Sequence, residues 1–129
     1  MGKWRDGSGT LTVGTDADVR EVPLRIAASY RARTRGLLGV DGVEGALLLT
    51  PAGSVHTFRM RFTIDVAYLD RKFNVLAVRT MKPGRLGLPR LRARHVVESG
   101  AGEMERWGLR PGTRVRVSAS VTEVSPPVP

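Results

Sequence analysis

Alternating and continuous apolar runs along the chain predict a mainly β protein. Residues 10–13 and 19–26 alternate between apolar and polar positions on either side of the turn residues 14–18, a pattern typical of a hairpin. Pro23 lies within the second run, and because proline has no backbone N–H to donate, it predicts an edge strand. The continuous apolar run at residues 45–50 predicts a strand that is buried on both faces.

The second half of the chain repeats these signals. Residues 64–70 and 73–79 predict another hairpin, with Asp70 suited to opening the turn between them. Residues 95–98 predict a short strand. The alternation across residues 115–121 is the clearest in the sequence and predicts a half-buried strand.

Helical signals are few and short. Residues 27–36 contain helix formers followed by Gly36, and they predict a short helix. A second short helix is expected within residues 99–108, where Ser99 or a following glycine caps the start and Gly108 ends it. Residues 81–94 carry two prolines, two glycines and five positive charges without a helical period, so they predict a long loop.

These elements together predict the fold class and the domain organisation. We expect a mainly β (α+β) fold, a compact β barrel or sandwich of about seven short strands with two short covering helices. The expected divisions are a flexible N-terminal arm at residues 1–7, one globular β-rich domain at 8–122 and a Pro-rich C-terminal tail at 123–129.

Composition narrows the function classes. The chain has no cysteine, which excludes disulfides, thiolate zinc sites and a cysteine nucleophile. The sequence shows neither a secretory signal nor an apolar run long enough to span a membrane, so we expect a cytoplasmic protein without membrane attachment. The 21 Lys and Arg against 12 Asp and Glu give a net charge of +9, which favours encounters with polyanions or acidic partners. An arginine excess also follows from a GC-rich genome, and the oligomeric state cannot be read from the sequence.

Chemically able side chains concentrate between residues 54 and 70. Asp65 interrupts an apolar strand pattern, and a buried carboxylate there needs partners such as Arg59, Arg61, His56 or backbone donors. Glu98 arrives from a distant strand. The candidate ligand-binding residues are Ser54, His56, Thr57, Arg59, Met60, Arg61, Asp65 and Glu98.

No motif in the sequence dictates one chemistry. Ser54, His56 and Asp65 supply the residue types of a Ser/His/Asp hydrolase, but the G-x-S-x-G elbow is absent. His56 and His95 lack the spacing that forms a metal site, and a lone histidine beside a strand is more often structural. We therefore expect no metal and no cofactor, and the sequence carries no recognised catalytic motif.

Three motifs resemble the family called domain of unknown function 192. They are Arg33-Thr34-Arg35-Gly36-Leu37-Leu38-Gly39; Ser54-Val55-His56-Thr57 with Met60-Arg61, Ile64-Asp65-Val66 and Leu69-Asp70; and Val97-Glu98 with Ala101-Gly102 and Trp107-Gly108-Leu109. The resemblance implies a small, mainly β domain with no established activity. Its signature falls on His56, Thr57, Met60, Asp65, Asp70, Glu98 and Gly102. Arg59 stands where a glycine or aromatic residue is common in the family.

Three function hypotheses remain open. The first is a non-catalytic binding module for a small anion or an acidic protein segment, in which Arg59 and Arg61 supply charge and Asp65 orients them. The second is a hydrolase-like enzyme that uses His56 as base with Asp65 or Glu98. The third is sequence-nonspecific nucleic-acid binding through the basic surface, with steep salt dependence.

Overall fold

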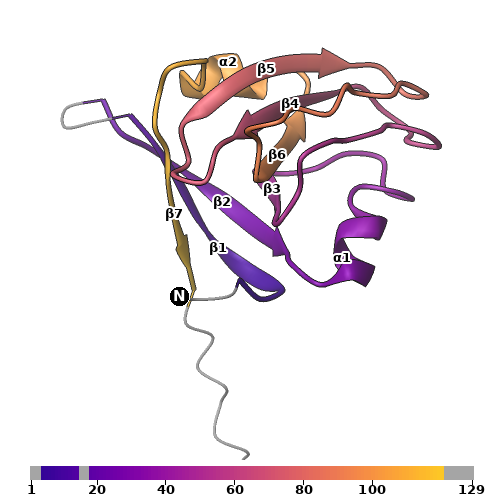
Figure 1. Ribbon diagram of the computed structural model, residues 1–129, viewed down its shortest axis with the longest axis horizontal. Coiled ribbons are helices and arrows are strands. Elements are labelled where there is room, and N and C mark those ends of the chain that lie inside the picture. The colour runs from indigo at the N-terminus through magenta and orange to yellow at the C-terminus, as the bar shows by residue number, and fades with distance from the viewer. Residues whose placement is uncertain (1–3, 15–17, 121–129) are drawn as a thin grey trace, which may run out of the picture.

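The computed structural model describes residues 4–14 and 18–120, which form seven strands and two short helices (Figure 1). All seven strands belong to one mixed sheet with the order β5-β4-β6-β3-β2-β1-β7. This confirms the predicted mainly β fold with α+β character. The elements are β1 (Gly7–Val13), β2 (Arg20–Ala27), α1 (Tyr30–Arg35), β3 (Ala46–Leu49), β4 (Ile64–Leu69), β5 (Val75–Met81), β6 (His95–Gly100), α2 (Glu103–Trp107) and β7 (Arg116–Ala119).

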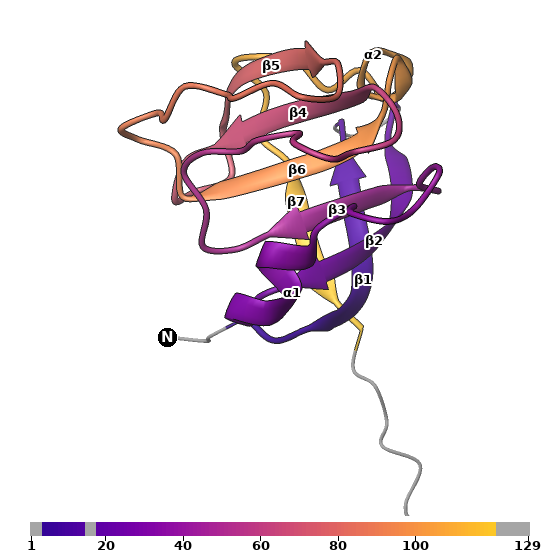
Figure 2. The same ribbon diagram turned by 90° about the vertical axis from the view of Figure 1, so that its right-hand side faces the viewer.

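The sheet curls into a sandwich-like form without closing into a barrel. In Figure 2, β5, β4, β6 and β3 stack one below another, while β1 and β7 cross behind them. The chain just before β7 also meets the start of β5, because Val75 N donates to Thr113 O at 2.8 Å and Val115 N donates to Phe73 O at 3.0 Å. These bonds tie the two ends of the strand order together at one corner.

The position of β2 corrects the expectation drawn from Pro23. β2 pairs with β1 on one side and runs parallel to β3 on the other, so it is a central strand. The ladder with β3 begins at the pair Leu24 and Ala46, one residue beyond Pro23. A proline is tolerated there because position 23 has no partner on β3, so its missing N–H group leaves no hydrogen bond of that ladder unmade.

Two apolar cores lie on the two faces of the sheet. Inside the curl, Leu11, Leu48 and Met104 are fully buried members of the first core. On the outer face, the second core includes Ile64, Val66 and Tyr68 and is covered by α1 and the long loops. β3 contributes to both cores, which confirms that it is buried on both faces. The second core matters for function because loops, rather than strands, cover it.

The start of the described chain is tied to the fold. Trp4 packs edge-on against Phe73 with ring centroids 6.0 Å apart, and β1 begins at Gly7. The Asp6 carboxylate accepts hydrogen bonds from the Ser29 hydroxyl and from the N–H groups of Ala28 and Ser29, at 2.6–2.8 Å. Residues 4–7 of the predicted arm therefore hold the start of α1. The rest of that arm, hairpin residues 15–17 and the predicted tail at 123–129 lie outside the described residues.

The predicted β4–β5 turn and the C-terminal ends of both helices occur where the sequence places them, whereas α1 begins at Tyr30 because Ala27 still belongs to β2. The Asp70 carboxylate accepts from the N–H groups of Lys72 and Asn74, which closes the β4–β5 turn. Ser29 caps α1, since its hydroxyl accepts from Ala32 N at 3.1 Å. α2 ends at Gly108, whose φ of 73° a glycine adopts without strain. In the described part of the chain, no helix has the length and apolar character needed to cross a membrane.

Candidate functional site

A pocket of about 510 Å³ opens on the outer face of the sheet, beneath α1. One wall is α1 with the following residues 36–38, and the opposite wall is the loop at 51–56. Its lining includes Tyr30, Arg33, Arg35, Gly36, Leu37, Leu49, Ala52, Ser54, Val55, His56, Met60, Ala93, Arg94 and Glu98. The walls are largely apolar, and the charged groups are few enough to be considered one by one.

Glu98 on β6 is the only carboxylate in the lining of this pocket. Its side chain is 3% exposed, and burial raises its pKa to about 7. No hydrogen bond to its carboxyl group is formed within residues 4–14 and 18–120, so burial acts alone on its pKa. Glu98 therefore gives the pocket a polar group that is free to meet a ligand.

The end of α1 lies directly above Glu98. The helix ends at Gly36, whose φ is 46°, and a Cβ built there would lie 3.8 Å from Glu98 Oε1. Arg33 braces this wall, because its Nε donates to Ala28 O at 3.2 Å and its Nη1 donates to Pro51 O at 3.1 Å. The guanidinium of Arg33 thus joins α1 to the loop across the pocket.

Four of the eight predicted residues line this pocket: Ser54, His56, Met60 and Glu98. Met60 is buried, whereas Ser54 and His56 are exposed. The His56 ring stacks on Phe58 with centroids 4.9 Å apart, and its Nδ1 accepts from Phe58 N at 3.4 Å. No hydrogen bond joins His56 to a carboxylate in the described part of the chain, so the pair expected of an acid–base catalyst is not formed.

Thr57, Arg59 and Arg61 have other surroundings. The fully buried Thr57 hydroxyl donates to Lys82 O at 2.6 Å and accepts from Arg85 N at 2.8 Å, which fastens two loops together. Arg61 forms an exposed ion pair with Asp41 at 3.1 Å. Arg59 is exposed and has a φ of 64°, a conformation that glycine adopts most readily.

Asp65 lies on the opposite face of the sheet from Glu98. Oδ1 accepts from the Thr80 hydroxyl at 2.8 Å, and Oδ2 accepts from the N–H groups of Gly102 and Met104 at 2.8 and 3.3 Å. Backbone donors were among the predicted partners of a buried Asp65, whereas Arg59 and Arg61 do not contact it. Asp65 supplies the cap of α2, because the residue at the helix start, Gly102, has no side chain with which to cap it.

His95 is a structural histidine. It is buried, its Nδ1 lies 2.7 Å from the Thr50 hydroxyl, and its ring stacks on Phe73 with centroids 4.2 Å apart. Burial lowers its pKa, so the neutral ring is favoured. Among the described residues, no three His, Asp or Glu side chains gather closely enough to hold a metal ion.

Sequence reasoning missed Arg33, Gly36 and Arg94 as pocket residues. Arg33 lies in the predicted short helix and Arg94 in the predicted long loop, and neither was among the candidate residues. Their places depend on how the helix and the loops cross the sheet, and neither crossing leaves a local pattern. The Gly36-Leu37-Leu38 motif carried a signal, although its spacing did not reveal that it faces Glu98.

A match to a family model shows which family the chain belongs to. Residues 11–117 match the model of the DUF192 family, described as uncharacterized ACR. The chain belongs to the DUF192 family. This confirms the resemblance drawn from the three motifs, and the structure adds that residues from all three, among them Gly36, His56 and Glu98, line one pocket.

Relatives of this DUF192 chain are uncharacterised as well. A UPF0127 protein of Pyrococcus horikoshii is 36% identical over 90 residues, which cover 66% of this chain and 78% of that protein. A UPF0127 protein of Pyrococcus furiosus is 34% identical over 110 residues, covering 81% of this chain and 94% of that protein.

Solved structures share the fold. A protein of unknown function from Novosphingobium aromaticivorans superposes with a TM-score of 0.72 at 16% identity, covering 83% of each chain. A protein of Sinorhizobium meliloti described as a putative transcription regulator superposes with a TM-score of 0.68 at 14% identity, covering 90% of this chain and 98% of that one. At these identities, the likeness extends to the fold alone.

Proposed function

We propose that this protein is a binding module whose pocket beneath α1 takes a small organic anion. Glu98 carries the proposal, because its carboxyl group is buried in the lining and has no hydrogen-bond partner among the described residues. A ligand group that exchanges a hydrogen bond with Glu98 would offset the cost of burying it. The site keeps Ser54, His56, Met60 and Glu98 from the predicted set.

The charges around the pocket favour an anionic ligand. Arg33, Arg35 and Arg94 line it together with a single carboxyl group, that of Glu98. With a pKa of about 7, Glu98 holds a proton in much of the population near neutral pH and can then donate to a ligand oxygen. Arginine on the lining favours carboxylate or phosphate groups, because its planar guanidinium binds two oxygens at once.

The shape and lining favour a small organic body attached to that charge. Leu37, Leu49, Val55 and Met60 present apolar surface, and a volume of about 510 Å³ suits a metabolite-sized molecule. A free carboxylate with an apolar or hydroxyl-bearing skeleton matches both parts of the lining. The alternative ligand is an acidic segment of a partner protein. Such a segment is larger than the pocket, so it would have to insert a single acidic side chain.

The hydrolase-like alternative has less support. His56 and Glu98 line the same pocket, but the Nδ1 of His56 accepts from Phe58 N and no carboxylate orients the ring. A general base needs that hydrogen-bonded partner or one bridging water. We therefore assign binding, rather than catalysis, to this site.

The test is a thermal-shift and calorimetry screen with acetate, benzoate, succinate, lactate and glutamate. A binder at about 100 times its Kd stabilises the fold by about 2.7 kcal/mol, which is several degrees for a domain of this size. Glu98→Leu should weaken binding about tenfold or more, since it removes the group that exchanges a hydrogen bond with the ligand. Glu105→Leu, an exposed change on α2, is the matched control and should leave the affinity unchanged.

The same screen separates this pocket from the site first inferred from the sequence. Arg59→Ala should leave affinity intact, because Arg59 does not line the pocket. Loss of binding in Arg59→Ala with full binding in Glu98→Leu would move the site to residues 59–61. If none of these acids gives a shift that depends on Glu98, the proposal is rejected.

A further inference from the structure

A second hollow lies on the same outer face, on the other side of the loop at residues 54–60. Its volume is about 490 Å³, and Tyr68, Arg79, Lys82, Arg85 and Arg90 contribute to its lining. A backbone hydrogen bond from Gly87 N to Val55 O, 2.8 Å long, lies at the boundary, because Val55 lines the first pocket and Gly87 the second. The hollow is therefore a separate site from the pocket that contains Glu98.

Four cationic side chains and no acidic ones line this hollow. The ion pairs formed within residues 4–14 and 18–120 are Arg61 with Asp41 and Arg106 with Glu103, so none of the four is neutralised by a carboxylate there. Of the carboxylates on neighbouring strands, Glu98 lines the other pocket, and Asp65 accepts from Thr80, Gly102 and Met104. The positive charge in the hollow thus lacks a counter-charge from the described chain.

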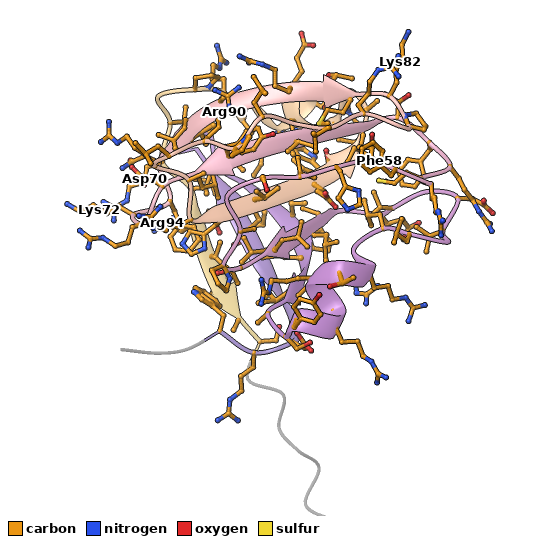
Figure 3. All side chains as sticks on the ribbon, turned by 45° about the vertical axis from the view of Figure 1, so that its right-hand side comes forward. Phe58, Asp70, Lys72, Lys82, Arg90 and Arg94 are labelled. Carbon is orange, nitrogen blue, oxygen red and sulfur yellow. The ribbon has the colours of Figure 1, made fainter. Side chains whose placement is uncertain are left out.

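Arg90 gives the hollow a donor without an acceptor. Its guanidinium lies 4.8 Å from the centre of the Tyr68 ring, and its Nε is buried without a hydrogen-bond partner among the described residues. Burying an N–H group without an acceptor costs folding free energy. Because the Arg90 guanidinium packs against the Tyr68 ring, it cannot turn freely to find water. Figure 3 shows Arg90 against the outer strands and Lys82 beyond the end of β5.

The backbone around the hollow is held in place before any ligand arrives. Thr57 binds Lys82 O and Arg85 N, while Arg90 N donates to Gly53 O at 3.1 Å. Gly87 fits closely, since a Cβ there would lie 2.6 Å from the Tyr68 hydroxyl. Burial raises the pKa of Tyr68, so its hydroxyl keeps its proton and can donate. The backbone that carries the hollow is therefore fixed, which lowers the entropic cost of binding.

We propose that this hollow binds the phosphate group of a small phosphorylated molecule. The lining carries positive charge and no acidic side chain, and a phosphate monoester carries up to two negative charges and several acceptor oxygens. The Arg90 guanidinium offers the planar donor geometry that pairs with phosphate oxygens. Leu86 and Leu88, which also line the hollow and are exposed, offer apolar surface to the rest of the molecule.

The experiment titrates the full chain with inorganic phosphate and with phenyl phosphate, followed by calorimetry and by ¹H–¹⁵N NMR of the arginine Nε–H groups. We expect saturable binding and a downfield shift of the Arg90 Nε–H resonance as it gains an acceptor. Arg90→Met should reduce affinity about tenfold or more, because a charge-assisted hydrogen bond is lost. Arg92→Met removes the same charge from an exposed position in the same loop and is the matched control.

The outcomes distinguish a specific binding site from a general effect of positive surface charge. Equal weakening by Arg90→Met and Arg92→Met, or phosphate binding that never saturates, would show a diffuse basic surface and overturn the proposal. If Arg90→Met fails to fold, Arg85→Met, at an exposed lining residue, takes its place. Glu98→Gln should retain phosphate binding, so failure of the pocket beneath α1 and failure of this hollow can be told apart.

Discussion

At the scale of single residues, Glu98 and Arg59 occupy positions that suit their side chains poorly. Glu98 is 3% exposed and its carboxyl group has no hydrogen-bond partner among the described residues, and Arg59 is a side chain in the left-handed region of backbone space. The resemblance to the family had already set Arg59 apart, as a residue at a position where it implies a glycine or an aromatic. Its φ of 64° suits glycine, because glycine has no Cβ to clash with the neighbouring carbonyl.

Replacing Arg59 by glycine should therefore stabilise the protein. The left-handed conformation costs a non-glycine residue about 1–2 kcal/mol, and the greater freedom of glycine in the unfolded chain takes back about 0.5–1 kcal/mol. We expect the free energy of unfolding, measured by urea denaturation, to rise by about 0.5–1 kcal/mol in Arg59→Gly. Arg59→Ala keeps the Cβ and should change it by less than about 0.5 kcal/mol. A gain of the same size in both variants would trace the effect to the lost charge instead.

At the scale of elements, short helices and long loops are positioned by side chains from elsewhere in the chain. α2 has five residues, too few to be stable alone, and its N-terminal amides are bound by Asp65 from β4. Thr57 similarly holds the loop at residues 82–85, which contributes Lys82 and Arg85 to the second hollow. Residues 54–65 are thus divided between framework and site, although they are adjacent in sequence.

Asp65→Asn should loosen α2 while leaving both hollows in place. The amide oxygen can still accept from Gly102 and Met104, but it lacks the negative charge that strengthens these bonds, so we expect a loss of about 2 kcal/mol in unfolding free energy. Amide hydrogen exchange at Met104 and the following residues should accelerate more than exchange in β6. The control, Asp41→Asn, breaks the exposed ion pair with Arg61 and should cost less than about 1 kcal/mol. Similar losses from the two changes would contradict a capping role for Asp65.

At the scale of the whole molecule, the curled sheet encloses one core and leaves the other to be covered by loops. Both hollows form in this loop layer, on the face that carries Glu98 and Tyr68. The net charge of +9 acts over the whole surface and changes further as carboxylates titrate. The contribution of Glu98 to stability is therefore best isolated as a difference between variants.

Glu98 should make the protein less stable as pH rises from 4.5 to 7. In the unfolded chain its carboxyl group ionises near 4.5, whereas the folded protein keeps the proton up to a pKa of about 7. The folded state thus binds more protons in this window, and the free energy of unfolding falls by up to about 3 kcal/mol across it. Glu98→Gln stays neutral, so its stability advantage over the wild type should be small at pH 4.5 and largest above pH 7.

Urea denaturation of both proteins between pH 4.5 and 8 measures this difference, and Glu105→Gln serves as the exposed control. A constant difference between Glu98→Gln and the wild type across the range would mean that Glu98 is ionised in the folded protein throughout.

The sequence by itself determined the local structure. Period-two alternation, the Asp70 turn and the glycines at 36 and 108 predicted the strands, the β4–β5 turn and the C-terminal ends of the helices, because each depends on contacts within a few residues. The sequence also singled out Glu98 and His56, whose residue types are able to do chemistry. Family membership followed from motifs that are themselves local.

The tertiary structure alone decided which of these residues meet. Asp65 and Glu98 both belong to buried strands, and only the strand register places them on opposite faces of the sheet. Pro23 is tolerated in a central strand because the ladder with β3 begins one residue later. Arg33, Arg90 and Arg94 reach the two hollows through crossings of helix and loop over the sheet. Long-range pairing sets these positions, and no short segment of sequence encodes it.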